Sequence, residues 1–317
     1  MPYGCDKDST GPTDETDKSL IVASTRLGKY AIIDPETGNE IAEPTPGTLI
    51  VTKPCLGYLS AKAFFLSHEQ GIGGSCLFGC DAQTGANQYK LINQTNINVQ
   101  EVDGSPMAQT LALSGILSTA NRSYVFTVAE DGSNLTQITA VDEPMTLPNS
   151  ATEVKLQSGG VPAWSPDGTQ IGFFSGVRES LTNLAHSCVV IMNSDGSNKQ
   201  ILYSKPVEEA HYRDACWTSD GSFLMFSVEE NGRKVKAINL ASNAVSDITN
   251  AMDTGDAVEY FCISPNEMKI VFNHRNDYHL KTVNLTANGN NLSASGSTAF
   301  ASTHAYTYPD WAGWDGN

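Results

Sequence analysis

The sequence is poor in charged residues and has no long apolar run. Only 17% of the 317 residues are charged, so long solvated faces of surface helices are not expected. No stretch reaches the roughly eighteen apolar residues that a transmembrane helix needs, which excludes such a helix. Basic residues are scarce, with 19 Lys and Arg against 35 Asp and Glu and a formal net charge of −16. A nucleic-acid-binding protein is therefore excluded, because phosphate binding requires a basic surface.

Several local catalytic motifs are also missing. The chain has no G-x-S-x-G, so the nucleophile of a Ser-His-Asp hydrolase has no candidate. Neither C-x-x-C nor H-E-x-x-H occurs. Cys76 and Cys80 lie four positions apart on one expected strand, about 13 Å if extended, which is too far for a disulfide. The remaining apolar-flanked cysteines are interpreted as small core residues.

The N-terminal segment differs from the rest of the chain. Residues 1–19 are polar, acidic and without periodicity, which predicts a disordered tether. Gly4-Cys5 followed by such a tether resembles the processed end of a bacterial lipoprotein, and acylation of Cys5 is the hypothesis that follows. A start codon followed by a chance cysteine is the alternative.

An internal repeat organises residues 20–317. Six segments share an apolar strand, a turn, a second apolar strand, and a Gly- or Asn-centred hairpin before a short polar strand. The spacings between successive hairpin residues are 47, 47, 64, 47 and 46, for Gly38, Gly85, Gly132, Gly196, Asn243 and Gly289. The fourth repeat is longer by 17 residues, which we assign to 140–160 and 176–187. Both segments are expected to be loops that project from one face.

Each repeat has the composition of a four-stranded propeller blade. In the fourth, the expected strands are 161–164, 169–176, 188–194 and 199–204, with a tight SPDG turn after the first. These strands are apolar throughout, as expected where stacked sheets bury both faces. The recurring Trp164, Trp217 and Trp311 are interpreted as packing between blades.

The fourth repeat resembles a known family. WSPDGTQIGFFSG followed by VVIMNSDGSNKQIL is similar to the repeats of TolB-like (PD40/WD40-like) β-propellers, and WTSDGSFLMFSV and ISPNEMKIVFN are weaker copies. The resemblance covers the propeller part only and implies an all-β, six-bladed propeller of four-stranded blades. The first repeat lacks an inner Trp-bearing strand, whereas YPDWAGWDGN (308–317) supplies one. We therefore expect the C-terminal strand to complete the first blade and remove the open edges.

A recognition surface is predicted on the face that carries the blade-to-blade connections. The repeat register places all six histidines there, among aromatic, basic and acidic residues suited to ligand recognition. The predicted ligand-binding residues are His211, Tyr212, Arg213, Glu259, Tyr260, His274, Arg275, His304, Tyr306 and Tyr308. A divalent metal held by His211, His274 (or His279) and His304 is a further hypothesis, against that of unremarkable polar loops.

These observations favour a non-enzymatic, monomeric binding protein of the bacterial cell envelope, in the periplasm or at the cell surface. Its partner would be an envelope protein or a glycan, no cofactor is expected, and any membrane attachment would be through lipidated Cys5. The alternative is a metal-assisted lyase or hydrolase that acts on an acidic polysaccharide. A structural module within a larger surface assembly is the third hypothesis.

Overall fold

The structure is a computed structural model in which only part of the chain is described. The described residues are 18–25, 29–35, 37–44, 49, 51–57, 61–68, 74–92, 96–207, 209, 211–230, 232–248, 258–264, 268–274, 279–299 and 306–314. They form strands and turns without any helix. Consequently, this part of the chain has no helix that could cross a membrane. The predicted lipidation site Cys5 lies outside the described residues, and the first strand begins at Lys18, two residues before the predicted boundary.

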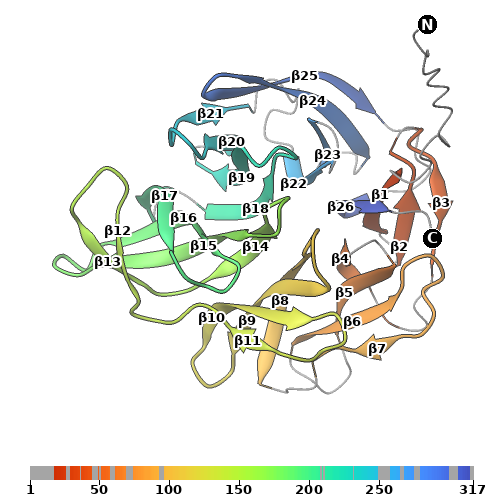
Figure 1. Cartoon of the computed structure of the whole chain (residues 1–317), viewed down its shortest axis with the longest axis horizontal. Coiled ribbons are helices and arrows are strands. Elements are labelled where there is room, and N and C mark those ends of the chain that lie inside the picture. The colour runs from red at the N-terminus through yellow and green to blue at the C-terminus, as the bar shows by residue number, and fades with distance from the viewer. Residues whose placement is uncertain are drawn as a thin grey trace, which may run out of the picture.

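Six antiparallel sheets surround a central axis as the blades of a propeller, which confirms the predicted fold (Figure 1). From the axis outward, the first blade has β26 (Tyr306–Trp314), β1 (Lys18–Thr25), β2 (Tyr30–Ile33) and β3 (Glu40–Ala42). The second has β4 (Thr52–Leu56), β5 (Lys62–His68), β6 (Ser75–Asp81) and β7 (Tyr89–Lys90). The third has β8 (Ile97–Gly104), β9 (Thr110–Leu117), β10 (Arg122–Ala129) and β11 (Thr136–Gln137).

The second half of the chain forms the other three blades. The fourth has β14 (Gly160–Trp164), β15 (Gln170–Glu179), β16 (Ala185–Asn193) and β17 (Gln200–Pro206), preceded by β12 (Pro144–Thr146) and β13 (Glu153–Leu156). The fifth has β18 (His211–Trp217), β19 (Phe223–Glu229), β20 (Arg233–Asn239) and β21 (Val245–Asp247). The sixth has β22 (Val258–Ile263), β23 (Lys269–His274), β24 (Leu280–Asn288) and β25 (Asn291–Ala299).

The predicted hairpins adopt the backbone conformation that their residues favour. All six turn positions have a positive φ, between 57° and 86°, at Gly38, Gly85, Gly132, Gly196, Asn243 and Gly289. Glycine and asparagine tolerate this left-handed region better than other residues, which explains why they recur at the repeat spacing. The turn residues thus confirm the repeat register.

The two ends of the described chain meet in the first blade. β26 pairs antiparallel with β1, and Trp311 lies opposite Ile21. The same register places Trp164 opposite Ile171 in the fourth blade. The predicted closure is therefore confirmed, and it removes the unpaired edges that an open ring would leave.

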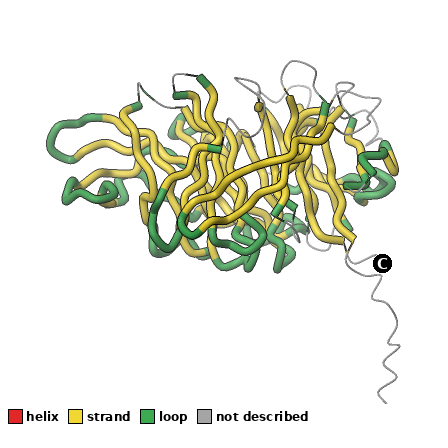
Figure 2. Tube along the Cα trace, turned by 90° about the horizontal axis from the view of Figure 1, so that it is seen from above, coloured by secondary structure: helices red, strands yellow, loops and turns green. Residues whose placement is uncertain are grey.

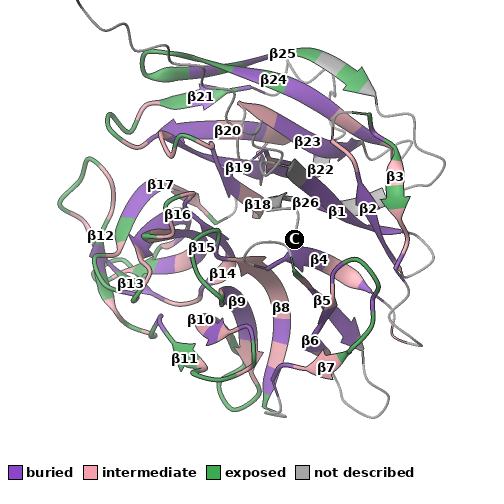
Figure 3. Cartoon of the chain, turned by 45° about the vertical axis from the view of Figure 1, so that its right-hand side comes forward, coloured by how far each residue is buried: buried purple, intermediate pink, exposed green. Residues whose placement is uncertain are grey.

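The apolar core is divided into six clusters, each between two neighbouring blades. Alternation along β19 shows how one strand serves two of them. Phe223 and Met225 pack towards the sixth blade, whereas Leu224 and Phe226 pack towards the fourth. Both faces of the central strands are buried, while outer strands such as β3, β11 and β12 are largely exposed (Figure 3). This explains why the central strands are apolar throughout.

The connections define two faces of the disc, which Figure 2 shows from the side. The turn face carries the turns between the first and second and between the third and fourth strands of each blade. The connection face carries the turns between the second and third strands and the segments that lead to the next blade. The short SPDG-type turns therefore lie on the turn face, and the variable segments lie opposite.

The expectation that the 17 surplus residues are loops was wrong. β12 and β13 form a hairpin, and β13 pairs with residues 177–179 of a lengthened β15, which gives a six-stranded sheet (Figure 1). The alternation in Glu153–Leu156, where Val154 and Leu156 are buried between exposed Glu153 and Lys155, was the signal for a strand. We call β12, β13 and residues 177–187 the blade 4 extension.

Candidate functional site

The structure places the predicted histidines where the repeat register put them. His68 and His274 end the second strands of their blades, His186 and His279 lie at the start of third strands, and His211 starts an inner strand. All five positions therefore belong to the connection face. His304 and Arg275 lie outside the described residues, as do the side chains of His274, Glu259, Tyr306 and Tyr308.

His211 and Arg213 lie together with an acidic residue at the end of the fifth blade. Arg213 Nη2 donates to Glu229 Oε2 at 2.9 Å, and both side chains are 45% exposed. This hydrogen bond, followed by the charge of Arg213, lowers the pKa of the Glu229 carboxyl, and the charges of Arg233 and His211 contribute less. These charged side chains therefore face solvent. An exposed ion pair such as Arg213–Glu229 is weak, so either partner can bind a charged ligand instead.

The Tyr212 ring packs among aromatic side chains of two blades. Its ring stacks on Phe174 at a centroid distance of 5.0 Å and meets Phe226 edge-on at 5.6 Å. Its hydroxyl donates to the Ser187 carbonyl at 3.3 Å, and burial raises the pKa of the phenol. The ring therefore packs between the fourth and fifth blades. Tyr260 is half-buried, and its backbone N–H donates to Asn273 Oδ1 at 2.8 Å.

A second ionic network joins the fourth and fifth blades on the same face. Glu230 is held between Lys205 Nζ, at 3.3 Å, and Lys236 Nζ. Lys236 also lies over the ring of Tyr203, 5.4 Å from its centroid, and donates to its hydroxyl at 3.2 Å. Two ammonium groups thus share one carboxylate, which leaves this network cationic on a strongly acidic protein.

Sequence reasoning missed a charged group around the axis. Lys53 of β4 and Glu101 of β8 form an ion pair, and Lys53 Nζ also donates to the Gln100 carbonyl at 2.9 Å. Asp214 of β18 accepts the N–H groups of Phe261 at 2.7 Å and of Ala215 at 3.1 Å. Burial and the charge of Glu101, partly offset by these hydrogen bonds and by the charge of Lys53, raise the pKa of Asp214 to about 7. Burial also raises the pKa of Glu101, against the effect of Lys53.

A local irregularity accounts for where these side chains lie. In each blade the pairing of the innermost strand with its neighbour contains a register shift. Such bulges re-aim side chains next to an axis or a site. Lys53, Glu101 and Asp214 all lie within or beside them, three residues before the strand end. An alignment of the six repeats would have placed these three residues near the same point of their inner strands, and this is the one sequence signal for the charged group.

The metal hypothesis remains a prediction. Among the described residues, no group of three or more His, Cys, Asp or Glu side chains is arranged to hold a metal ion. Two of the three predicted ligands, His274 and His304, have no described side chain. The six described cysteines are buried and form no disulfide, in agreement with their interpretation as core residues.

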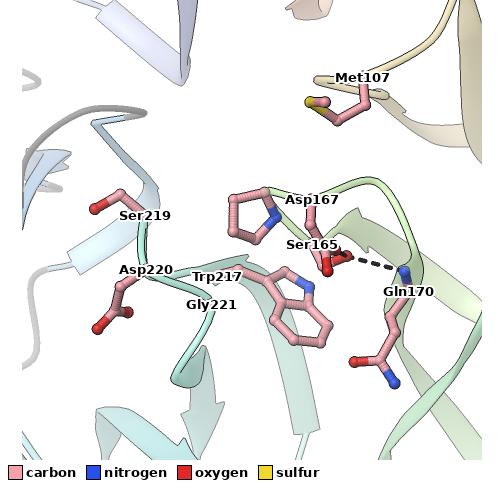
Figure 4. A pocket seen from close by; sticks show the side chains of 9 residues that line it. Met107, Ser165, Asp167, Gln170, Trp217, Ser219, Asp220 and Gly221 are labelled. Atoms are coloured by element: carbon pink, nitrogen blue, oxygen red, sulfur yellow. Dashed lines mark hydrogen bonds between the residues drawn. The ribbon is translucent and has the colours of Figure 1, made fainter.

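The turn face contains a hollow of about 410 Å³ between three blades (Figure 4). It is lined by Met107, Ser165, Pro166, Asp167, Gln170, Trp217, Ser219, Asp220 and Gly221. Three turns build it, one each from the third, fourth and fifth blades. The turns nest closely, since a Cβ on Gly168 would lie 2.8 Å from Met107 Cβ and one on Gly221 would lie 3.5 Å from Pro166 Cγ.

The strands and their order define the class of this protein as a six-bladed β-propeller. Neither a family model nor a curated protein matches the chain. Solved structures match it along nearly its whole length. A chain of the nidogen/laminin complex superposes with a TM-score of 0.60 at 8% identity, covering 93% of this chain and 98% of the other.

Two further structures relate to the hypotheses made from the sequence. The putative TolB from Agrobacterium tumefaciens has a TM-score of 0.56 at 14% identity, covering 95% of this chain and 92% of the other. Oligogalacturonate lyase from Vibrio parahaemolyticus has a TM-score of 0.52 at 12% identity, covering 88% and 78%. At such low identities the similarity establishes the fold, which hosts unrelated functions, and leaves function to the site.

Proposed function

We propose that this protein is a non-enzymatic binding protein of the bacterial cell envelope that recognises a protein or glycan through its connection face. The observation that carries the proposal is the blade 4 extension. Leu181 is 98% exposed, Leu184 is 49% exposed and nearby Val207 is 40% exposed. Val207 N–H donates to the Ala185 carbonyl at 3.1 Å, so Leu184 and Val207 are neighbours at one end of the blade.

Exposed apolar side chains grouped at a projecting edge are typical of macromolecular contact surfaces. A small substrate is instead enclosed by a concave pocket. The adjoining charged groups, Arg213–Glu229 and Lys205–Glu230–Lys236, would supply the polar rim of such an interface. The envelope location rests on the resemblance to TolB-like propellers and on the Gly4-Cys5 motif.

The test uses chemical cross-linking and capture from a bacterial envelope extract, followed by identification of the bound species. Leu181→Ser combined with Leu184→Ser should reduce capture of that species about tenfold, because both side chains would lie in the interface. The matched control is Ile41→Ser, which alters another exposed apolar residue on the first blade, 58% exposed. Equal capture by the double variant and the unaltered protein would overturn the proposal.

The enzyme alternative has its own readout. The protein is assayed with added divalent metal ions for cleavage of acidic polysaccharides, by new reducing ends or unsaturated uronates. Cleavage that is lost in His211→Ala would replace the binding proposal with the lyase or hydrolase.

A further inference from the structure

The hollow on the turn face combines carboxylates with apolar side chains. Its nine described lining residues include Asp167 and Asp220 and no basic residue. Met107, Pro166 and Trp217 give it an apolar side, and Met107 is 60% exposed at its edge. Figure 4 shows Trp217 between the two aspartate-bearing turns, with Met107 across the hollow. An apolar wall beside carboxylates suits a side chain with an aliphatic stem and a cationic end.

The two carboxylates are fixed and ionised before any ligand arrives. Asp167 Oδ1 accepts the Ser165 hydroxyl at 2.6 Å and the Thr169 N–H at 3.0 Å. Asp220 Oδ1 likewise accepts the Thr218 hydroxyl at 2.6 Å and the Ser222 N–H at 3.0 Å. Hydrogen bonds from Ser165 and Thr169 lower the pKa of Asp167. At Asp220, burial alone would raise the pKa, but hydrogen bonds from Ser222 and Thr218 outweigh it, and the pKa is lowered overall.

Acceptor capacity remains on both carboxylates. Asp167 Oδ2 accepts only the Thr169 hydroxyl, at 2.9 Å, and Asp220 Oδ2 accepts only the Ser222 hydroxyl among the described contacts. A carboxylate offers about four lone-pair positions, so each Oδ2 can accept a further charged donor. Trp217 is held in place because its Nε1–H donates to the Ala163 carbonyl at 3.0 Å. The hollow is therefore preorganised, which lowers the entropic cost of binding.

We propose that this hollow binds an arginine or lysine side chain from a basic segment of a partner protein. The net charge of −16 would attract such a segment over a distance and speed its association. The site lies on the opposite face from the interface proposed above and does not depend on it. A single side chain inserted between three blades would also join their turns, because each blade contributes one wall.

The probe is the peptide acetyl-Gly-Arg-Gly-Arg-Gly-amide, and its affinity is measured by calorimetry at low ionic strength. Asp167→Asn and Asp220→Asn retain an acceptor for the turn hydrogen bonds but remove the charge. Each is expected to weaken binding about three- to tenfold, as loss of one charge-assisted hydrogen bond predicts. Met107→Ala should weaken it about twofold, through loss of the apolar wall.

Asp195→Asn is the matched control. Asp195 also accepts a serine N–H and hydroxyl within its own turn, at 2.9 and 2.6 Å from Ser197, but lies outside the hollow. It should leave the affinity unchanged. The peptide with citrulline in place of arginine, which is neutral and of similar shape, should not bind. Thermal unfolding of each variant verifies that it is folded.

Three outcomes would overturn the proposal. The first is no measurable binding of the arginine peptide. The second is an equal loss of affinity in Asp195→Asn, which would indicate attraction to the acidic surface in general. The third is that spermidine binding is weakened by Asp167→Asn and Asp220→Asn whereas peptide binding is not. That result would indicate a free polyamine as the ligand.

Discussion

The fourth and fifth blades have nearly the same signature, yet equivalent side chains have different environments. Trp164 lies opposite Ile171 and Trp217 lies opposite Leu224, each followed by a turn that ends in Asp-Gly. Trp217 Nε1 donates to the carbonyl of Ala163 in the preceding blade. Trp164 Nε1 is buried and has no hydrogen-bond partner among the described residues. The repeat thus determines where a side chain lies, and the neighbouring blade decides whether its polar atom is satisfied.

A second pair of equivalent positions differs in charge. Asp214 lies three residues before Trp217, and Val161 lies three residues before Trp164. Val161 has a φ of 50°, unusual for a β-branched residue, whereas the Asp214 carboxylate connects the fifth blade to the sixth through Phe261 N–H. Three comparisons test how far the two blades are equivalent.

The largest effect is expected from the shared apolar positions. Phe173 and Phe226 each lie two residues beyond the tryptophan's partner, and both are fully buried against the preceding blade. Phe173→Ala and Phe226→Ala should each reduce the free energy of unfolding by about 3–5 kcal/mol, through lost burial and a residual cavity. Denaturant unfolding measures both. Val245→Ala, at an exposed position, should change it by less than about 0.5 kcal/mol. Losses that differ strongly between the two phenylalanines would contradict equivalence of the blades in their interior.

The pH dependence of stability should distinguish the fifth blade, which has Asp214, from the fourth, which has Val161 at the equivalent position. The pKa of Asp214 is raised to about 7 in the folded protein, above the ordinary value of 3.8. The carboxyl therefore favours folding below its unfolded pKa, and that contribution is lost as the pH rises through about 7. Glu101, whose pKa is also raised, acts in the same direction, and Lys53 opposes both.

The measurement is the difference in unfolding free energy between the unaltered protein and Asp214→Asn at pH 4 to 8. That difference should decline with increasing pH, by on the order of 2 kcal/mol. Comparing the two proteins at each pH cancels the opposite contribution of carboxyls with lowered pKa, such as Asp167 and Asp220. A difference that is constant with pH would show that Asp214 titrates normally.

The smallest effect is expected from the loss of one hydrogen bond, which the indole N–H of Trp217 donates. Trp217→Phe leaves the buried Ala163 carbonyl without this donor, whereas Trp164→Phe removes a donor that has no partner. Because both replacements remove similar volume, Trp217→Phe should cost about 1–2 kcal/mol more than Trp164→Phe. Thermal or denaturant unfolding of the two variants gives this difference directly. Equal costs would indicate that Trp164 Nε1 also has a partner.

The candidate site was predictable only in part. The register assigned all six histidines to the connection face, and the five that lie at described positions are found there together with Arg213. It did not reveal that the Tyr212 ring is covered by Phe174 and Phe226, because those residues belong to two different sheets. It also interpreted Glu153–Leu156 as part of a loop, although the alternation of a short strand was present. A repeat insertion can add strands as readily as loops when its neighbour, here β15, is long enough to pair with it.

The amino-acid sequence by itself determined the number of blades, the positions of the six repeat hairpins and the closure by the last strand. The turn positions depend on residues that favour a left-handed backbone, and these residues are visible within one repeat. The number of blades and their closure depend on apolar strands that recur at a fixed spacing along the chain. The tertiary structure decided which polar groups meet. Lys53 and Glu101 are 48 residues apart, and Asp214 and Phe261 are 47 apart. Because the members of each pair lie about one repeat apart, the fold places their positions side by side in neighbouring blades. Whether the two side chains can form a hydrogen bond or an ion pair depends on both residues, and no local sequence pattern relates them.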